Sequence, residues 1–140
     1  MTAKEYLMQA FRAKKKIASL REDIQRLEDA ATDCSANITG MPHNQSPTQS
    51  RMADIVCKMV DRKAELQKMI LEGESLIAEI RFNISFLENP DYKDILYRRY
   101  IECQEWQDIA IAMTFAESYV FRLHRKAIAA FDRLLTQEDS

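Results

Sequence analysis

The stretch from Glu105 to Phe131 reads EWQDIAIAMTFAESYVFRLHRKAIAAF, and its apolar residues follow the pattern of two helices joined by a tight turn. A helix-turn-helix consists of a helix of about eight residues, a turn, and a second helix that crosses the first. We expect the first helix to bury one apolar face. That face consists of Trp106, Ile109, Ala110 and Met113. The small side chain of Ala110 suits the place where the two helices cross.

The predicted turn and second helix supply the remaining contacts of this unit. Phe115 would fill the turn with an apolar side chain, and the second helix, predicted over residues 116–133, would pack back against the first. The residues spaced for this packing are Val120, Leu123 and Ala127. Such a turn usually contains glycine because its backbone tends toward positive φ. This chain departs from that pattern, since Thr114 stands four residues after Ala110.

At about 100° per residue, the predicted second helix has an apolar side and a basic side. The apolar side is centred on Val120 and includes His124 and Phe131. The opposite side and its flanks consist of Ser118, Tyr119, Arg122, Arg125, Lys126 and Ala129. Between Ser118 and Phe131 the chain has three Arg or Lys residues and no acid. Readout of the major groove requires a basic, hydrogen-bonding face, although a merely solvated face has a similar composition.

The rest of the chain is poor in the residues that form turns. Its 140 residues include two glycines and three prolines, whereas hairpins and sandwiches need turn residues every several positions. We therefore expect an all-α fold made of a few long helices. The formal net charge is −2, so any affinity for nucleic acid has to come from a local patch.

A long helix with a seven-residue repeat is expected at the start of the chain. From Ala3 to Ile38 the apolar residues form the two rows that a coiled-coil seam requires. The rows are Ala3, Ala10, Ile17, Ile24, Ala31, Ile38, and Tyr6, Ala13, Leu20, Leu27, Cys34. A basic cluster falls off this seam and consists of Arg12, Lys14, Lys15 and Lys16. We interpret this cluster as a solubility feature, with contact to DNA phosphate as the alternative.

A second heptad pattern follows a loop that we predict over residues 39–49. Ser46 would cap the next helix and Pro47 would lie in its first turn. The second pair of rows is Met52, Met59, Leu66, Gly73, Ile80, Leu87, and Val56, Lys63, Ile70, Ile77, Ile84, in which the lysine is an interruption. Because the loop is short, we expect an antiparallel coiled-coil hairpin. One hairpin cannot cover both seams fully, which leaves room for a second copy of the chain in a homodimer.

The segment LENPD before Tyr92 marks the end of this hairpin. Asn89 as a cap, Pro90 as the first helical residue and the acid that follows them are a strong signal for a new helix. We place the domain boundary there. Residues 1–88 are predicted to form the coiled-coil hairpin, and residues 89–140 are predicted to form a helix-turn-helix domain of three helices.

The titratable residues do not indicate an enzyme. His124 lies near the apolar side of its helix and the other histidine, His43, lies in the distant loop, so we expect His124 to pack and not to be catalytic. The chain has no glycine-rich phosphate loop and its paired carboxylates are expected on solvated helices, so we expect no cofactor. The three cysteines are Cys34, Cys57 and Cys103. Their wide spacing fits reduced thiols better than a disulfide framework or a metal site.

The first residues give an expectation about the compartment. They read MTAKEYLMQAFRAKKK, in which charged and apolar residues alternate without a long apolar run. Such a segment is neither a signal peptide nor a membrane span. We therefore expect a cytoplasmic protein that has no membrane partner.

Taken together, the motifs LYRRY, EWQDIAIAM and SYVFRLHRKA resemble region four of bacterial sigma factors. The wider arrangement, with MTAKEYL, RMADIV and NPDYKDILYRRY, resembles the sigma-region-four-like phage and prophage regulators of the RinA/ArpU kind. This resemblance covers most of the chain and is most specific from Asn89 to Ala130. It implies sequence-specific binding to double-stranded DNA and control of transcription, with contact to RNA polymerase as a further option. The DNA-binding residues that it implies are Ser118, Tyr119, Arg122, Arg125 and Lys126.

Two alternatives from other classes stay open. A helical hairpin with a helix-turn-helix also suits a small terminase-like subunit that packages phage DNA in a ring, which needs a heterologous surface between subunits. The last domain would otherwise be a protein-interaction module that contacts RNA polymerase and not DNA. The mass of the protein in solution separates a ring from a dimer.

Overall fold

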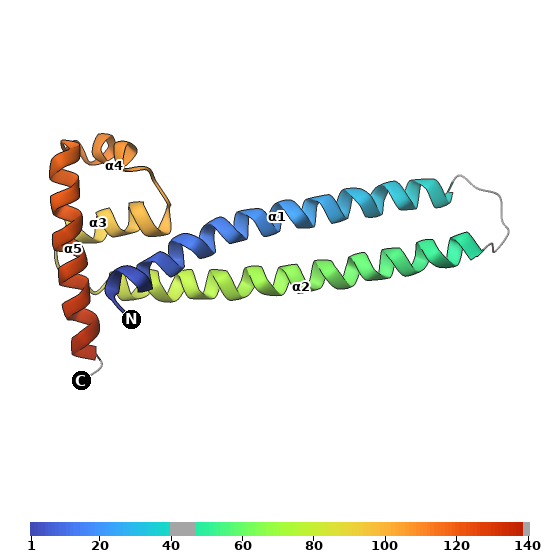
Figure 1. Cartoon of the computed structure of the whole chain (residues 1–140), viewed down its shortest axis with the longest axis horizontal. Helices are drawn as coiled ribbons and strands as arrows, with labels where there is room; N and C mark the ends of the chain where they lie inside the picture. Colours follow the sequence, from blue (N-terminus) through green and yellow to red (C-terminus); the bar gives the residue numbers. More distant parts are fainter. Residues whose placement is uncertain (40–46, 139–140) are drawn as a thin grey trace. The chain divides into compact units, whose positions relative to one another are not determined.

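The computed structural model describes the backbone of residues 1–39 and 47–138 and the side chains of residues 1–33 and 50–137. Over these residues it contains helices and no strand (Figure 1). The elements are α1 (Ala3–Thr39), α2 (Pro47–Ile84), α3 (Pro90–Leu96), the π-helix η1 (Tyr97–Ile101), α4 (Trp106–Met113) and α5 (Glu117–Glu138). The predicted all-α fold is therefore confirmed.

Contacts divide the chain into two compact units. One unit is Ile17–Glu72, and the other combines Met1–Lys16 with Gly73–Ser140. We call them the distal unit and the core unit. Both α1 and α2 contribute residues to each of the two units.

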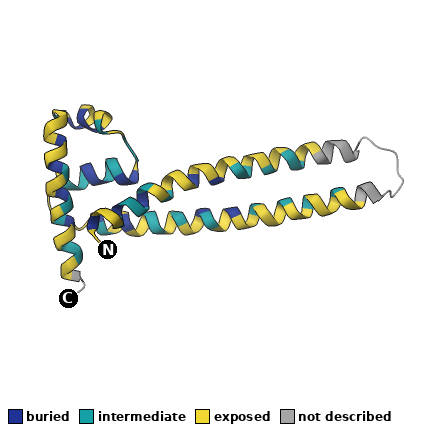
Figure 2. Ribbon diagram, in the orientation of Figure 1, coloured by how far each residue is buried: buried dark blue, intermediate teal, exposed yellow. Residues whose placement is uncertain are grey.

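In the distal unit, α1 and α2 run antiparallel to each other (Figure 1). The side chains that are buried in this unit are Ile17, Leu20, Leu66 and Ile70, all from the predicted heptad rows. The other apolar positions of these rows in the unit are only half-buried where their side chains are described (Figure 2). They include Ile24, Leu27, Met52, Val56 and Met59. The two helices of one chain thus cover part of the seam.

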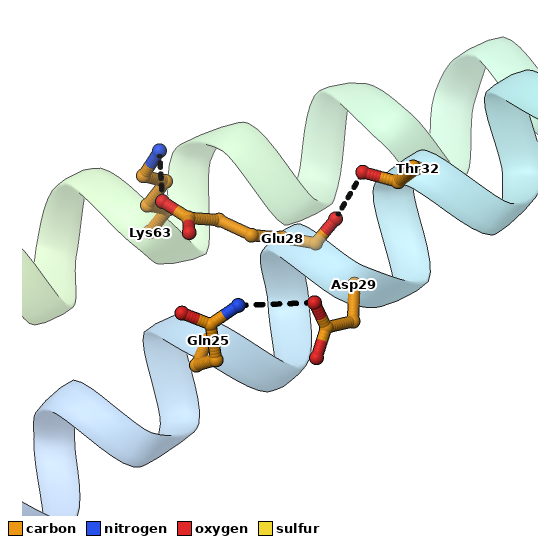
Figure 3. Close-up of polar contacts among 5 residues, drawn as sticks. All are labelled: Gln25, Glu28, Asp29, Thr32 and Lys63. Atoms are coloured by element: carbon orange, nitrogen blue, oxygen red, sulfur yellow. Dashed lines mark hydrogen bonds and ion pairs between the residues drawn. The ribbon is translucent and has the colours of Figure 1, made fainter.

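Lys63, which interrupts the predicted row, forms an ion pair between the two helices. Its Nζ lies 2.8 Å from Oε1 of Glu28 in α1 (Figure 3). The two side chains are 36% and 44% exposed, so solvent screens the pair and its contribution to stability is below about 1 kcal/mol. Gln25 and Asp29 form a second polar contact of 3.0 Å along α1 itself. Lys63 therefore interrupts the apolar row without leaving its charge unpaired.

Part of the predicted loop over residues 39–49 lies outside the described residues, namely residues 40–46 with the predicted cap Ser46. On either side of these residues the helices extend further than the prediction. Thr39 still belongs to α1, and α2 begins at Pro47. Proline at the start of a helix is favourable because the first turn needs no hydrogen bond from its nitrogen.

The core unit packs the first turns of α1 and the end of α2 with all the later helices. Its buried side chains are Ala3, Leu7, Ala10, Ile80, Ile84, Leu87, Ile95, Leu96, Tyr100, Ile101, Ile109, Ala110, Met113, Val120, Leu123, Ala127 and Phe131. Leu7 is fully buried although it belongs to neither predicted row. The beginning of α1 packs in a core made of several helices. More of its apolar surface is therefore covered there than where α1 meets α2 alone. Asn83 Nδ2 also donates to Tyr6 Oη at 2.7 Å, which ties α2 to α1 in this unit.

The predicted restart at Asn89 is confirmed. The Asn89 side chain accepts a hydrogen bond of 2.9 Å from the backbone N–H of Asp91, and Pro90 is the first residue of α3. The core nevertheless contains residues from both sides of this break, such as Leu87 and Ile95. α2 ends at Ile84, four residues before the predicted division into residues 1–88 and 89–140, and the packing continues across the break.

Candidate nucleic-acid interface

The turn between α4 and α5 has a defined hydrogen-bonded geometry. Thr114 has φ 59° and ψ 39°, so its backbone is in the left-handed region. The N–H of Thr114 donates to Ile111 O at 3.2 Å and the N–H of Phe115 donates to Ala110 O at 3.0 Å. This pair of bonds is the Schellman motif, in which the residue after the left-handed one packs back on the helix. The turn therefore has the positive φ that usually favours glycine, with threonine in its place.

Apolar residues hold α4 and α5 together around this turn. Ile109, Ala110 and Met113 of α4 are buried, and so are Val120, Leu123 and Ala127 of α5. Phe115 is half-buried and packs against the same core. These contacts agree with the predicted inner faces of the two helices.

The predicted recognition face of α5 is exposed. All five residues named for DNA contact, Ser118, Tyr119, Arg122, Arg125 and Lys126, are in the exposed class. The Arg122 guanidinium carbon lies 5.9 Å from the centre of the Tyr119 ring, which in turn meets Phe115 edge-on at 4.7 Å. Among the described side chains, no ion pair includes the three cations of this face. The three charges are thus available to an external anion.

His124 has a partner that the sequence interpretation missed. Its Nε2 lies 2.7 Å from Tyr100 Oη, within hydrogen-bonding distance, and the two rings stack at 5.7 Å. Trp106 meets the imidazole edge-on at 4.7 Å. The sequence pattern gave no sign of this partner, because 24 residues separate His124 from Tyr100 and only the folded core brings them together.

Burial sets the protonation of this pair. It lowers the pKa of His124 to about 4, and the nearby charges of Lys4 and Arg99 act in the same direction. Burial also raises the pKa of Tyr100 to about 12, with Arg99 opposing. Both side chains are therefore neutral near pH 7. The two neutral side chains, at hydrogen-bonding distance, tie α5 to η1 within the core.

Arg99 of η1 links α1 to α4. Its guanidinium carbon lies 4.9 Å from the Phe11 ring centre and 4.6 Å from the Trp106 ring centre, so the cation is held between two rings. Its Nη1 also donates to Gln104 O at 2.9 Å. Trp106 then contacts Phe121 of α5 at 5.2 Å between ring centres. The pattern of apolar residues gave no signal for this arrangement because it depends on an arginine and on residues from three helices.

Three further features of the described residues concern metals, thiols and membranes. Among their side chains there is no group of three His, Cys, Asp or Glu residues placed to hold a metal ion. Cys57 and Cys103 are free thiols, and the side chain of Cys34 lies outside the described residues. No helix, over the part of the chain described, combines the length and apolar character that a membrane span needs.

Comparison with models of protein families gives a match over more than half of the chain. Residues 43–132 match the family described as "Protein of unknown function (DUF1492)", a segment that contains α3, η1, α4 and the five exposed residues of α5. No curated protein matches the chain, and no solved structure matches it. Because the matched segment is well over half of the 140 residues, the chain belongs to the DUF1492 family.

Proposed function

We propose that this chain is a sequence-specific DNA-binding regulator of transcription, with α5 lying in the major groove of duplex DNA. The observation that carries the proposal is the exposed face of α5, which lies opposite its buried apolar side and has three cations outside any described ion pair. Arginine can donate to O6 and N7 of guanine together, and Ser, Tyr and Lys can contact phosphates. Such a face suits duplex DNA better than an apolar partner.

The turn supports the same proposal. A recognition helix must leave its partner helix at a fixed angle so that its first turns can enter the groove. The Schellman bonds of Thr114 and Phe115 and the packed side chain of Phe115 fix the chain between α4 and α5. Ser118 and Tyr119, the first two residues proposed to contact DNA, lie exposed in the first turn of α5.

The resemblance to sigma region four and to the RinA/ArpU regulators supports the biological part of the proposal. By that resemblance the regulated genes are those of a phage or prophage, and the protein acts in the cytoplasm of a bacterial cell. RNA polymerase is then a candidate second partner. The half-covered heptad rows of the distal unit support a homodimer, since Ile24, Leu27 and Met59 are only half-buried by their own chain.

Selection of bound duplexes from a random pool tests the function directly. The full chain is incubated with random-sequence duplex DNA, and the bound fraction is amplified and sequenced. Enrichment of one motif is expected, and two related half-sites would indicate a dimer on the DNA. Absence of any enriched motif would contradict sequence-specific binding and would favour a protein-interaction role.

Two alanine variants of α5 test the assignment of the face. Arg122→Ala should weaken binding to the selected duplex by roughly 1–3 kcal/mol and relax preference at one base pair, if Arg122 reads a base. Lys126→Ala should weaken binding to all duplexes alike and reduce the slope of affinity against salt by about 1. Affinities of both variants are measured on the selected and on a mixed-sequence duplex. Parental affinity and salt slope in both variants would show that this face does not contact DNA.

A further inference from the structure

Two lysines of α1 lie beside the segment that leads into α4. Lys14 and Lys15 are exposed, one helical turn after Phe11. The Cys103 thiol, in the segment before α4, donates to Phe11 O at 3.7 Å. Burial raises the pKa of this thiol, and the charges of Lys14, Lys15 and Arg99 oppose that shift. Three cations are therefore within electrostatic reach of the same point on the core unit.

A series of contacts joins these lysines to the recognition helix. Lys15 Nζ lies 4.5 Å above the Phe11 ring, and Arg99 lies between Phe11 and Trp106. Trp106 in turn contacts Phe121 of α5, whose ring is 40% exposed. Each step in this series is between 4.5 and 5.2 Å. We call Lys14, Lys15 and Arg99 the basic strip.

The recognition face continues this strip along α5. Arg125 is exposed and stands one helical turn after Phe121, so the two side chains lie on neighbouring parts of the same helix face. The contacts through Phe11, Arg99, Trp106 and Phe121 therefore run from the basic strip to the edge of the recognition face within the core unit. The strip lies on α1 and η1, and the recognition face lies on α5.

The cations of the basic strip have no ion-pair partner among the described side chains. Between Tyr6 and Leu20 the chain has four Lys or Arg residues and no Asp or Glu. Gathering like charges costs stability unless an anion compensates them. Solubility alone requires charge but does not require it beside α4.

A duplex phosphate backbone fits this surface better than a single strand does. Single-strand binding relies on aromatic faces on which bases stack. Here the rings of Phe11 and Trp106 already contact Arg99, and Trp106 also contacts Phe121 and His124. The Phe11 and Trp106 rings thus already contact cations or rings of the protein itself, and Lys14 and Lys15 are exposed to solvent. Lysine binds phosphate as a point charge without reading sequence.

We propose that Lys14 and Lys15 bind backbone phosphates of the same duplex whose major groove α5 enters. This inference rests on the proposed function and extends it, because the first helix then contributes to DNA affinity and not only to the hairpin. It replaces the interpretation of these two lysines as a solubility feature. Arg99 is a positioning residue in this arrangement, since its guanidinium holds Phe11 and Trp106 together.

A salt titration with matched variants tests the inference. The full chain and the double variant Lys14→Gln/Lys15→Gln are bound to a mixed-sequence duplex of about 30 base pairs, three helical turns. The salt concentration is raised from about 50 to about 200 mM. Each lost phosphate contact should reduce the slope of log affinity against log salt by about 0.9, so the double variant should lose roughly 1–2.

The same helix provides the control. Arg12 and Lys16 are also exposed, but at about 100° per residue they point away from the side of Phe11. The variant Arg12→Gln/Lys16→Gln therefore removes equal charge from a different face and should keep the parental slope. Circular dichroism checks that both double variants stay helical. Equal losses in the two variants, or no loss in either, would overturn the inference.

Two further outcomes separate this inference from the proposed function and from a single-strand ligand. If the parent enriches a motif from the random pool but the Lys14/Lys15 variant keeps the parental salt slope, sequence-specific binding stands. Only the phosphate contact of Lys14 and Lys15 is then refuted. If the variant has a smaller salt slope on the mixed duplex while the parent enriches no motif, the phosphate contact of Lys14 and Lys15 is supported. Sequence-specific regulation is then refuted. A larger loss on a single strand of equal length than on the duplex would overturn the duplex assignment.

Discussion

At the scale of single residues, His124 shows how burial controls a titration. The imidazole is packed between Tyr100 and Trp106 with its pKa lowered to about 4, whereas an unfolded chain titrates near its ordinary value of about 6.5. The unfolded state therefore binds a proton first as the pH falls. The neutral, buried imidazole therefore contributes fully to the free energy of unfolding above about pH 6.5. This contribution is lost as the pH falls from about 6.5 to about 4, and no further loss occurs below about pH 4.

We expect acid to destabilise the protein through His124. Allowing for its partial exposure, the loss between about pH 6.5 and pH 4 is on the order of 1–2 kcal/mol. Urea unfolding at a series of pH values measures this loss. His124→Gln should flatten the pH dependence in that window. Equal pH dependence in the parent and in His124→Gln would show that another group is responsible.

The residue pattern could predict which side of α5 is exposed but could not predict its partners. Spacing of about 3.6 residues per turn separates Val120 and Leu123 from Arg122 and Arg125 without any tertiary information. The contact of His124 with Tyr100, and of Arg99 with Phe11, depends on how helices far apart in sequence are placed. Polar and cation–ring contacts of this kind leave no periodic signal, so sequence reasoning missed them.

At the scale of elements, the turn after α4 stores strain in Thr114. A β-branched residue in the left-handed region costs roughly 1–2 kcal/mol, because its Cβ approaches the neighbouring carbonyl. Glycine avoids this clash but loses more backbone entropy on folding. The Schellman bonds around Thr114 involve only backbone atoms, so they do not depend on the threonine side chain.

Thr114→Gly also removes the hydrogen bond that Thr114 Oγ1 donates to Met113 O at 2.6 Å. The relieved strain should exceed the added entropy and this loss, so the substitution should stabilise the protein by up to about 1 kcal/mol. Thermal unfolding followed by circular dichroism measures the change. Ala112→Gly is the matched control, because Ala112 is exposed within α4 and glycine in a helix interior costs about 1 kcal/mol. The two substitutions should shift the melting temperature in opposite directions. A lower melting temperature for Thr114→Gly would show that the threonine side chain stabilises the turn.

Element boundaries followed from the sequence where a specific residue terminates a helix. Asn89 and Pro90 predicted the start of α3 because a cap and a proline act locally. The π-helix Tyr97–Ile101 was not predicted, since an N–H that bonds five residues back, as from Glu102 to Tyr97 at 2.9 Å, has no distinct residue pattern. Its consequence is that Tyr100 and Ile101 both reach the core.

At the scale of the whole molecule, the heptad rows predicted two long helices but not how their residues divide between units. The heptad rows continue along the full predicted length of both helices, and no Gly–Pro pair breaks them. The sequence therefore favours one continuous hairpin. In the structure the rows of Met1–Lys16 and Gly73–Ser140 belong to a multi-helix core. In Ile17–Glu72 only two helices of one chain meet, and half-buried residues remain there. Periodicity describes faces of helices and does not state how many neighbours will cover them.

The half-covered rows of the distal unit lead to the last prediction. Ile24 lies in the predicted seam and is half-buried, as are Leu27 and Met59. Coiled-coil rows of this kind are stabilised when a second pair of helices covers them. We expect the protein to form a dimer of two 16.3 kDa chains through this unit. A carboxylate at Ile24 would then be buried without a partner, which costs roughly 1–3 kcal/mol.

Ile24→Asp should therefore lower the melting temperature and give the mass of a single chain in sedimentation equilibrium. Ala18→Asp is the control, because Ala18 is exposed in the same unit and the substitution adds the same charge. It should keep the mass of two chains. A parent that sediments as one chain, or an Ile24→Asp variant that behaves like Ala18→Asp, would contradict the dimer. A parental mass of eight or more chains would instead contradict the regulator and favour a packaging ring, because a two-fold dimer on paired half-sites cannot produce a closed ring of that size.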